Sequence, residues 1–176
     1  MNPPRTLLVI AFGLGKILLA GAMDLPSAPP SPYIDKGGCP FEGCVYREWT
    51  AQRTIPLYDK PNGVRTGVFL RAGEHVVGLT GEVHSIPQRV VSDENITDLV
   101  DARRIRIAKG QVYYVIHYLG EGAWLVWHRG KLTSLDDVPV RAQSVRAVWW
   151  VRVKTSRGVV GWTISHNNFD GQDRFG

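Results

Sequence analysis

The sequence has few of the features that mark helical, collagen-like or disordered proteins. It contains only two methionines and little of the Ala, Glu, Lys and Leu periodicity that is typical of a helical bundle. Its 19 glycines and 11 prolines lack the repeat of collagen, and 44% hydrophobic against 21% charged residues excludes a wholly disordered chain. At 176 residues the chain has the size of one ordinary domain or two small ones.

The chain also lacks the short motifs of common catalytic and metal sites. It has no Gly-x-Ser-x-Gly elbow and no His-Glu-x-x-His zinc helix, and Leu125 stands where the first glycine of a P-loop belongs. The segment 166–171 faintly resembles a calcium loop but begins with a histidine, so we reject that interpretation. The five histidines are isolated, and His75 and His117 lie in apolar runs, which favours a structural role. We therefore expect no enzyme, no bound metal and no cofactor.

Residues 1–22 have the features of a cleaved export signal. Arg5 is followed by an apolar run, and Ala20 and Ala22 supply the small residues that a signal peptidase requires. Lys16 interrupts the apolar stretch, and this charge counts even more strongly against a spanning helix, which needs about 20 apolar residues. We predict cleavage after Ala22. An uncleaved anchor and a cytoplasmic protein with a fortuitous start are the alternatives.

After that cleavage the chain would carry a small positive charge without a basic tract. Losing Arg5 and Lys16 leaves 19 Lys and Arg against 16 Asp and Glu, a formal charge of +3. The densest basic cluster is Arg103, Arg104 and Arg106, which follows two aspartates. A solvated start of a strand explains this cluster better than a phosphate-binding patch. We expect neither a nucleic-acid partner nor a stable membrane span in the mature chain.

A proline-rich linker at residues 23–32 precedes an all-β body. Four prolines fall within residues 25–32, and from Tyr33 onward the pattern is almost entirely that of short strands separated by turn residues. We expect the folded domain at 33–168 and a polar tail at 169–176. The predicted strands are Val45–Ala51, Thr54–Tyr58, Gly67–Leu70, His75–Thr80, Arg104–Ile107, Val112–Leu119, Ala123–Trp127, Val148–Val153 and Val159–Ile164.

One segment departs from the strand pattern. In residues 92–102 Asp93 precedes Ile96, Leu99 and Val100, which have the spacing of one helical face. This segment fits a short helix and an irregular loop equally well.

Three segments, taken in order along the chain, match successive strands of one type of small barrel. The run 55–61 (IPLYDKP) matches a first strand and its loop, and 67–79 matches two strands joined by a Gly-Glu turn. Residues 150–162 match a closing hairpin that ends in Gly161-Trp162. In these segments the sequence resembles the bacterial Src homology 3 domains. The resemblance implies an SH3-like β-barrel with Trp150, Gly161 and Trp162 in its structural core.

The resemblance is interrupted in the middle of the chain. It covers about residues 52–83 and 147–165, and it fails between Ser85 and Val140, where residues 107–131 again resemble strands of the same barrel. Residues 70–79 and 107–116 also form a weak repeat, which is too short for a solenoid. We therefore expect either one barrel with an inserted β-meander or second half-barrel, or two merged units at about 45–90 and 103–166.

Cys39 and Cys44 are the only cysteines. The four residues between them include a proline and a glycine, which let the chain fold back. In an oxidising compartment a disulfide is the default pairing. Free thiols and a metal or redox role are the alternatives, although zinc would need two further ligands.

Aromatic residues supply the candidate binding face. The chain has six Trp and six Tyr, and strand alternation cannot bury every aromatic side chain of residues 112–118. We take Tyr118, Trp124 and Trp127 as candidate contact residues, because exposed aromatic side chains often mark interaction sites. The structural interpretation is that they pack under the inserted segment or the linker.

Together these features predict an exported binding module. We expect a secreted or periplasmic, non-catalytic protein, and the resemblance implies that it recognises a peptide, a cell-wall component or an envelope protein. One alternative is a structural or assembly protein of the envelope whose aromatic face pairs with another subunit. A further alternative is an accessory to a wall hydrolase.

Overall fold

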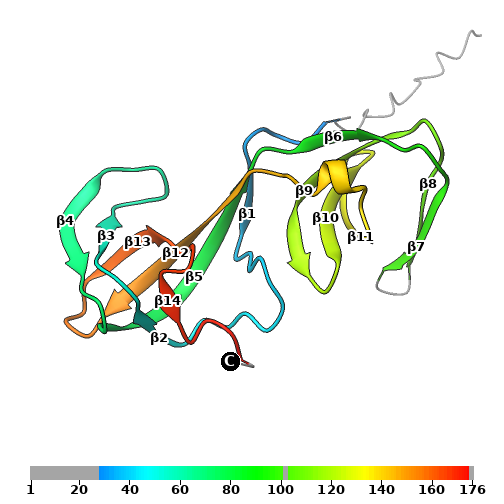
Figure 1. Cartoon of the computed structure of the whole chain (residues 1–176). Coiled ribbons are helices and arrows are strands. Elements are labelled where there is room, and N and C mark those ends of the chain that lie inside the picture. Colours follow the sequence, from blue (N-terminus) through cyan, green and yellow to red (C-terminus); the bar gives the residue numbers. More distant parts are fainter. Residues whose placement is uncertain (1–27, 101–102, 175–176) are drawn as a thin grey trace, which may run out of the picture.

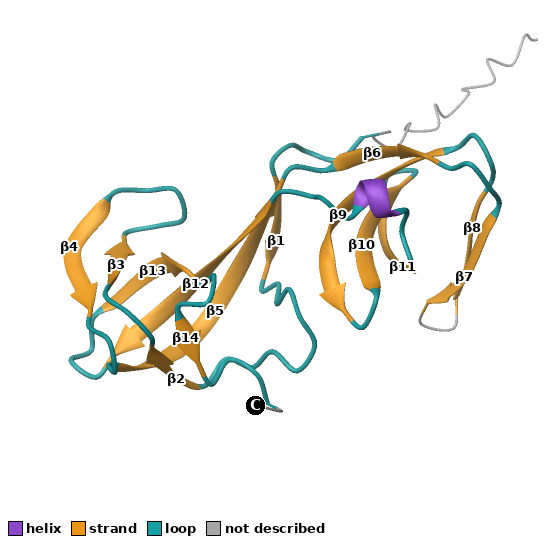
Figure 2. Cartoon of the chain, viewed as in Figure 1, coloured by secondary structure: helices purple, strands orange, loops and turns teal. Residues whose placement is uncertain are grey.

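Figure 1 shows the computed structural model, which describes residues 28–100 and 103–174. Fourteen strands and one short 3₁₀ helix form the regular structure of these residues (Figure 2). The predicted all-β, small-barrel class is thus confirmed. The predicted export signal at 1–22 lies outside the described residues. Within the described residues, no helix has the length and apolar character needed to span a bilayer.

The first unit is an eight-stranded sheet built from two separate segments, residues 33–85 and 147–170. Its order is β14-β2-β5-β12-β13-β3-β4, β1 pairs with β5, and neighbouring strands run antiparallel. The long strands β5 and β12 extend from this sheet toward the second unit (Figure 1). The strands are β1 (Tyr33–Lys36), β2 (Glu48–Ala51), β3 (Ile55–Tyr58), β4 (Arg65–Leu70), β5 (His75–Ser85), β12 (Ala147–Thr155), β13 (Val160–Ile164) and β14 (Phe169–Asp170).

The second unit is inserted between β5 and β12. Its main sheet has the order β11-β10-β9-β6, and the β7–β8 hairpin lies beside β11. The elements are β6 (Gln88–Val91), β7 (Ile96–Val100), β8 (Arg103–Ile107), β9 (Val112–Gly120), β10 (Ala123–His128), β11 (Lys131–Asp136) and the 3₁₀ helix η1 (Val140–Ala142). The expected insertion is therefore present. The alternative division at about 45–90 and 103–166 does not follow the sheets, because β12 and β13 belong to the first one.

The two units share a turn that the weak sequence repeat predicts. In the first unit the Gly73 amide donates to the Ala51 carbonyl at 2.7 Å, and in the second the Gly110 amide donates to the Ser92 carbonyl at the same distance. Both glycines have a positive φ, +79° and +85°. The side chain that follows each glycine, Glu or Gln, accepts a bond from the first amide of its turn at 3.0 and 2.9 Å. The repeat thus reflects one local structure used twice.

Each unit has its own apolar core, because strand alternation turns every second side chain inward. The first core consists of Trp49, Ala51, Ile55, Leu57, Leu70, Val76, Val83, Trp149, Val151, Val153 and Phe169. The second consists of Val90, Ile107, Tyr113, Val115, Val126, Leu135, Val138 and Ala142.

Most of the described part of the segment 92–102 is neither a helix nor an irregular loop. Residues 96–100 are β7, which pairs with β8 so that Ile96 lies opposite Ile107. Ile96 and Ile105 both pack against the second core. Their burial across a strand pair outweighs the helical spacing of the apolar residues, so the prediction for this segment is wrong.

The end of the chain is also more ordered than a polar tail. β14 pairs with β2, and Phe169 is only 6% exposed. The Gln172 carbonyl accepts a bond from the Val45 amide at 2.9 Å. The polar-tail prediction is wrong for residues 169–174, because Phe169 anchors them to the first core.

Candidate functional site

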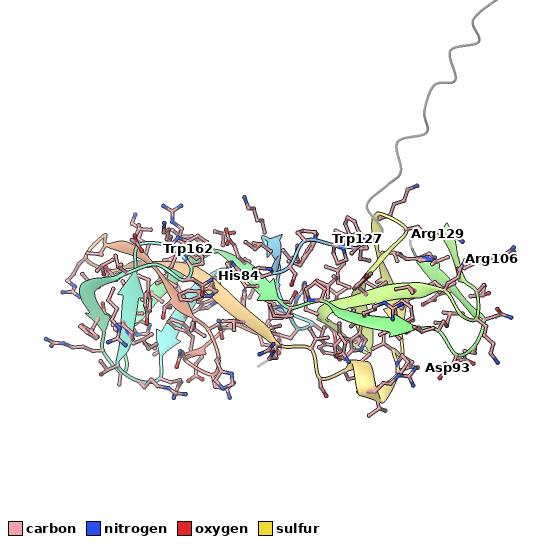
Figure 3. All side chains as sticks on the ribbon, turned by 90° about the horizontal axis from the view of Figure 1, so that it is seen from above. His84, Asp93, Arg106, Trp127, Arg129 and Trp162 are labelled. Carbon is pink, nitrogen blue, oxygen red and sulfur yellow. A yellow bond between two sulfur atoms is a disulfide. The ribbon has the colours of Figure 1, made fainter. Side chains whose placement is uncertain are left out.

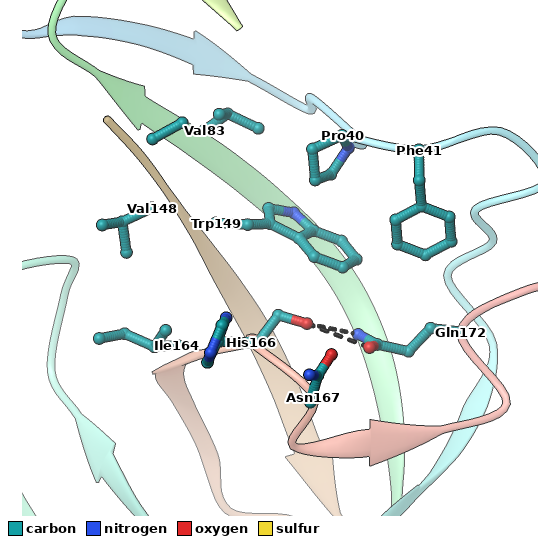
Figure 4. Close-up of a pocket in the computed structure, with 11 residues that line it drawn as sticks. Pro40, Phe41, Val83, Val148, Trp149, Ile164, His166, Asn167 and Gln172 are labelled. Atoms are coloured by element: carbon teal, nitrogen blue, oxygen red, sulfur yellow. Dashed lines mark hydrogen bonds between the residues drawn. The ribbon is translucent and has the colours of Figure 1, made fainter. Parts of the chain in front are cut away.

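An open groove of about 420 Å³ lies beside the start of β12 (Figure 4). The side chains around it come from the disulfide loop, from β5, β12 and β13, and from the segment after β13. They are Pro40, Phe41, Val83, Ala147, Val148, Trp149, Ile164, Ser165, His166, Asn167 and Gln172. Most are apolar, and His166 is the only one of them with an ionisable side chain. Pockets that bind ligands are typically concave, mainly apolar and of this size.

Two aromatic side chains form one wall of the groove. The rings of Phe41 and Trp149 meet edge to face with their centroids 5.6 Å apart. Trp149 is 9% exposed and belongs to the first core, whereas Phe41 is half-buried. The wall therefore combines a fixed ring from the sheet with a ring from a loop.

The loop that carries Phe41 is closed by a disulfide. Cys39 and Cys44 are bonded to each other, with their Cα atoms 6.0 Å apart, as the sequence predicts. Next to the loop, the Tyr46 hydroxyl donates to the Gly38 carbonyl at 2.9 Å. Burial raises the pKa of Tyr46, which favours the protonated form that donates this bond.

The opposite end of the groove is polar. The Ser165 hydroxyl lies 3.1 Å from Oε1 and 2.8 Å from Nε2 of Gln172, and both residues are buried. These two side chains satisfy each other and hold the segment after β13 in place. His166 and Asn167 are exposed at the rim, where they can bond a ligand. A mainly apolar lining with a few polar groups at one end is the usual arrangement of a ligand-binding pocket.

The second unit supports the disulfide loop from its other side. Gly120, at the end of β9, is buried with φ +116°, and an added Cβ there would lie 2.5 Å from the Glu42 amide nitrogen. A second link joins the units nearby. The buried His117 ring has Nε2 2.9 Å from Asp35 Oδ2 and Nδ1 2.7 Å from the Tyr118 carbonyl oxygen. His117 thus has the structural role that its apolar surroundings suggest.

The predicted contact residues divide between the two faces of the second sheet. Tyr118 and Trp124 meet with their ring centroids 5.1 Å apart, and Trp124 packs against the second core. Trp127 lies three residues further along β10, so alternation places it on the other face, opposite Tyr114. Figure 3 shows Trp127 on the opposite side of the molecule from Asp93. The structure therefore does not unite the three residues in one site, and none of them lines the groove.

The residues assigned to the barrel core also divide. Gly161 is buried, and an added Cβ would contact Leu57 of the first core. Trp162 must then point to the other face, where it is half-buried opposite Tyr58 (Figure 3). Trp150 shares that face but is 4% exposed, and its ring meets Tyr58 edge to face at 5.3 Å. The expectation that Trp162 packs inward is wrong.

Sequence reasoning missed Phe41 and Trp149, the two rings of the groove. Trp149 stands next to Trp150, and nothing in the sequence distinguishes it from the other tryptophans. Phe41 carries a usable signal, because it lies between two cysteines that close a short loop. A disulfide loop holds its side chains in fixed positions at the surface.

Comparison with known proteins identifies no relative: no family model, no curated protein and no solved structure matches this chain.

The contact between the disulfide loop and the second unit predicts a dependence on pH. Desolvation raises the pKa of Glu42, and the hydrogen bond to Glu121 and the negative charge of Glu121 raise it further. Because the folded chain then holds this proton more tightly than the unfolded chain, stability falls as pH rises from the unfolded pKa of about 4.3 through the higher folded value. We expect Glu121→Gln to reduce that fall in urea denaturation between pH 4 and 7. Glu48→Gln, an exposed glutamate on β2, is the control and should leave the profile unchanged. If the stability of Glu121→Gln depended on pH as that of wild type does, the interaction between Glu42 and Glu121 would be contradicted.

Proposed function

We propose that this chain is an exported, non-catalytic binding module whose groove holds an apolar segment of a peptide, supplied by the cell wall or by an envelope protein. The observation that carries the proposal is the groove itself. Its apolar lining contains no carboxylate, lysine or arginine, so it favours uncharged side chains. Because it is open, a segment of a longer chain can lie in it.

Two further observations support export. The disulfide between Cys39 and Cys44 persists where the surroundings are oxidising. The predicted signal at residues 1–22 would direct the chain to such a compartment. The resemblance to bacterial Src homology 3 domains adds the expectation of a peptide ligand.

A matched pair of valines tests the groove as the binding site. Val148 and Val160 are 40% and 39% exposed and lie on neighbouring strands of one sheet, but only Val148 lines the groove. The oxidised protein would be immobilised and offered solubilised wall fragments and envelope extract, with bound partners identified by mass spectrometry. We expect Val148→Glu to lower recovery about tenfold, because a buried unpaired charge costs more than the roughly 1.4 kcal/mol that this factor represents. Val160→Glu should bind like wild type.

The same pair separates this proposal from the alternatives. Equal recovery with both variants would show that the partner binds elsewhere and would overturn the groove as the site. Light scattering of the purified protein tests assembly directly. A dimer that only Val148→Glu dissociates would assign the groove to self-association instead.

A further inference from the structure

We propose that the groove accepts its partner only while the Cys39–Cys44 disulfide is formed, and that Phe41 is the residue through which this bond acts. The inference rests on the proposed function, because it concerns the same groove. It makes binding by this chain dependent on the redox state of its surroundings.

The loop contributes one part of the groove that no strand of the sheet holds. Val83, Val148 and Ile164 lie on strands whose ladders fix their positions. Pro40 and Phe41 lie instead between the bonded cysteines. They reach the groove only because the loop folds back over Trp149 (Figure 4).

The main chain is anchored before the loop and at its end, but residues 39–42 are not bonded to the sheet. Before the loop, the Gly37 amide donates to the Gly81 carbonyl at 2.7 Å. At the end of the loop, Gly43 accepts a bond from the Arg174 amide at 2.9 Å, and after it the Val45 amide donates to the Gln172 carbonyl at 2.9 Å. In the part of the chain that the structure describes, no main-chain hydrogen bond joins residues 39–42 to a strand of the sheet. The disulfide, the contact of Phe41 with Trp149 and the close packing of Glu42 against Gly120 therefore hold this segment.

Reduction would release Phe41 without removing the core. A dithiol supplies two electrons and two protons, the Cys39–Cys44 bond is cleaved to two thiols, and the dithiol becomes a disulfide. Both cysteines are only half-buried and lie at the margin of the first core, whose buried members all come from strands. The sheet should thus stay folded while one wall of the groove becomes mobile.

The test uses the full mature chain and N-phenyl-1-naphthylamine, an uncharged fluorescent probe for apolar grooves. Oxidised wild type, the protein in dithiothreitol and the variant Cys39→Ser/Cys44→Ser would be titrated with the probe. We expect at least tenfold weaker binding in the last two, with the far-UV circular dichroism of the oxidised protein retained. Oxidised Phe41→Ala should show the same loss, and dithiothreitol should weaken it no further. Phe69→Ala, which removes a 46% exposed ring on β4 outside the groove, is the control and should keep both binding and its redox dependence.

The outcomes separate this inference from the proposed function. Equal binding by oxidised and reduced protein overturns the inference but leaves the groove as a site. A further tenfold loss on reduction of Phe41→Ala would show that the bond acts through another residue. If the serine variant loses its circular dichroism, the oxidised Phe41→Ala protein decides, and undiminished binding there overturns the inference. Probe binding that Val148→Glu does not weaken would instead refute the groove itself.

Discussion

Replacing Trp49 by alanine is expected to lower the free energy of unfolding by about 3–5 kcal/mol, the range found for large aromatic residues removed from a core. Trp49 is 1% exposed and is the largest fully buried side chain of the first unit. Its ring lies 5.5 Å from Phe169 and 6.2 Å from Trp149, measured between centroids. Its indole nitrogen donates to the Val45 carbonyl at 3.0 Å. The loss would be a large share of the 5–15 kcal/mol that stabilises a domain.

Gly78 packs directly against the Trp49 ring, so a smaller side chain at position 49 would leave a cavity. An added Cβ on Gly78 would lie 2.6 Å from the Trp49 ring, so the strand and the indole are fitted closely to each other. Alanine at position 49 leaves the space of the indole unfilled, because the β-ladders around it cannot collapse inward.

Trp162→Ala is the matched comparison. Its half-buried ring lies on the outer face of the same sheet, so the expected loss is smaller, about 1–2 kcal/mol. Urea denaturation of both variants measures the difference directly. Equal losses would mean that the outer face contributes as much as the core and would contradict the assignment of the two faces.

The hairpin that contains Trp162 could be predicted from the sequence, but the face to which the Trp162 side chain points could not. The hairpin 150–162 is present, and β12 and β13 pair as the pattern predicts. The pattern does not say which member of Gly161-Trp162 faces inward. That choice depends on Leu57 of β3, which occupies the space next to Gly161. Alternation fixes the relative directions of neighbouring side chains, and only packing against other strands fixes which face is the core.

The remaining errors have the same origin. The segment 92–102 has helical spacing in isolation, but β8 provides a partner that the local sequence does not reveal. Phe169 lies among polar residues in the sequence, and the sequence does not show that β14 pairs with β2. The candidate groove could not be predicted, because Phe41 and Trp149 meet only after β5 and β12 have brought distant parts of the chain together. The Cys39–Cys44 bond was predictable because the two cysteines are close in sequence.

The second large effect is expected at Gly120, where the inserted unit contacts the disulfide loop. Gly120→Ala should lower the free energy of unfolding by about 2–6 kcal/mol, the sum of two penalties. One is the backbone strain of an L residue at φ +116°, about 1–3 kcal/mol. The other is overpacking, about 1–3 kcal/mol, because the new methyl would lie 2.5 Å from the Glu42 amide nitrogen, a backbone atom that cannot rotate away. Since Phe41 precedes Glu42, the loop and the groove wall should shift together.

Gly122→Ala carries only the first penalty, the backbone strain. It lies in the same turn with φ +85°, but its new methyl would meet only the Asp137 carboxylate at 4.0 Å. We therefore expect a loss of about 1–2 kcal/mol, from the backbone term alone. Urea denaturation and naphthylamine binding should be measured for both variants. Only Gly120→Ala should weaken binding of the probe, because only the methyl group at position 120 would displace the disulfide loop. Equal effects of the two variants on stability and binding would show that the second unit does not support the groove wall, and that its contact with Glu42 is incidental.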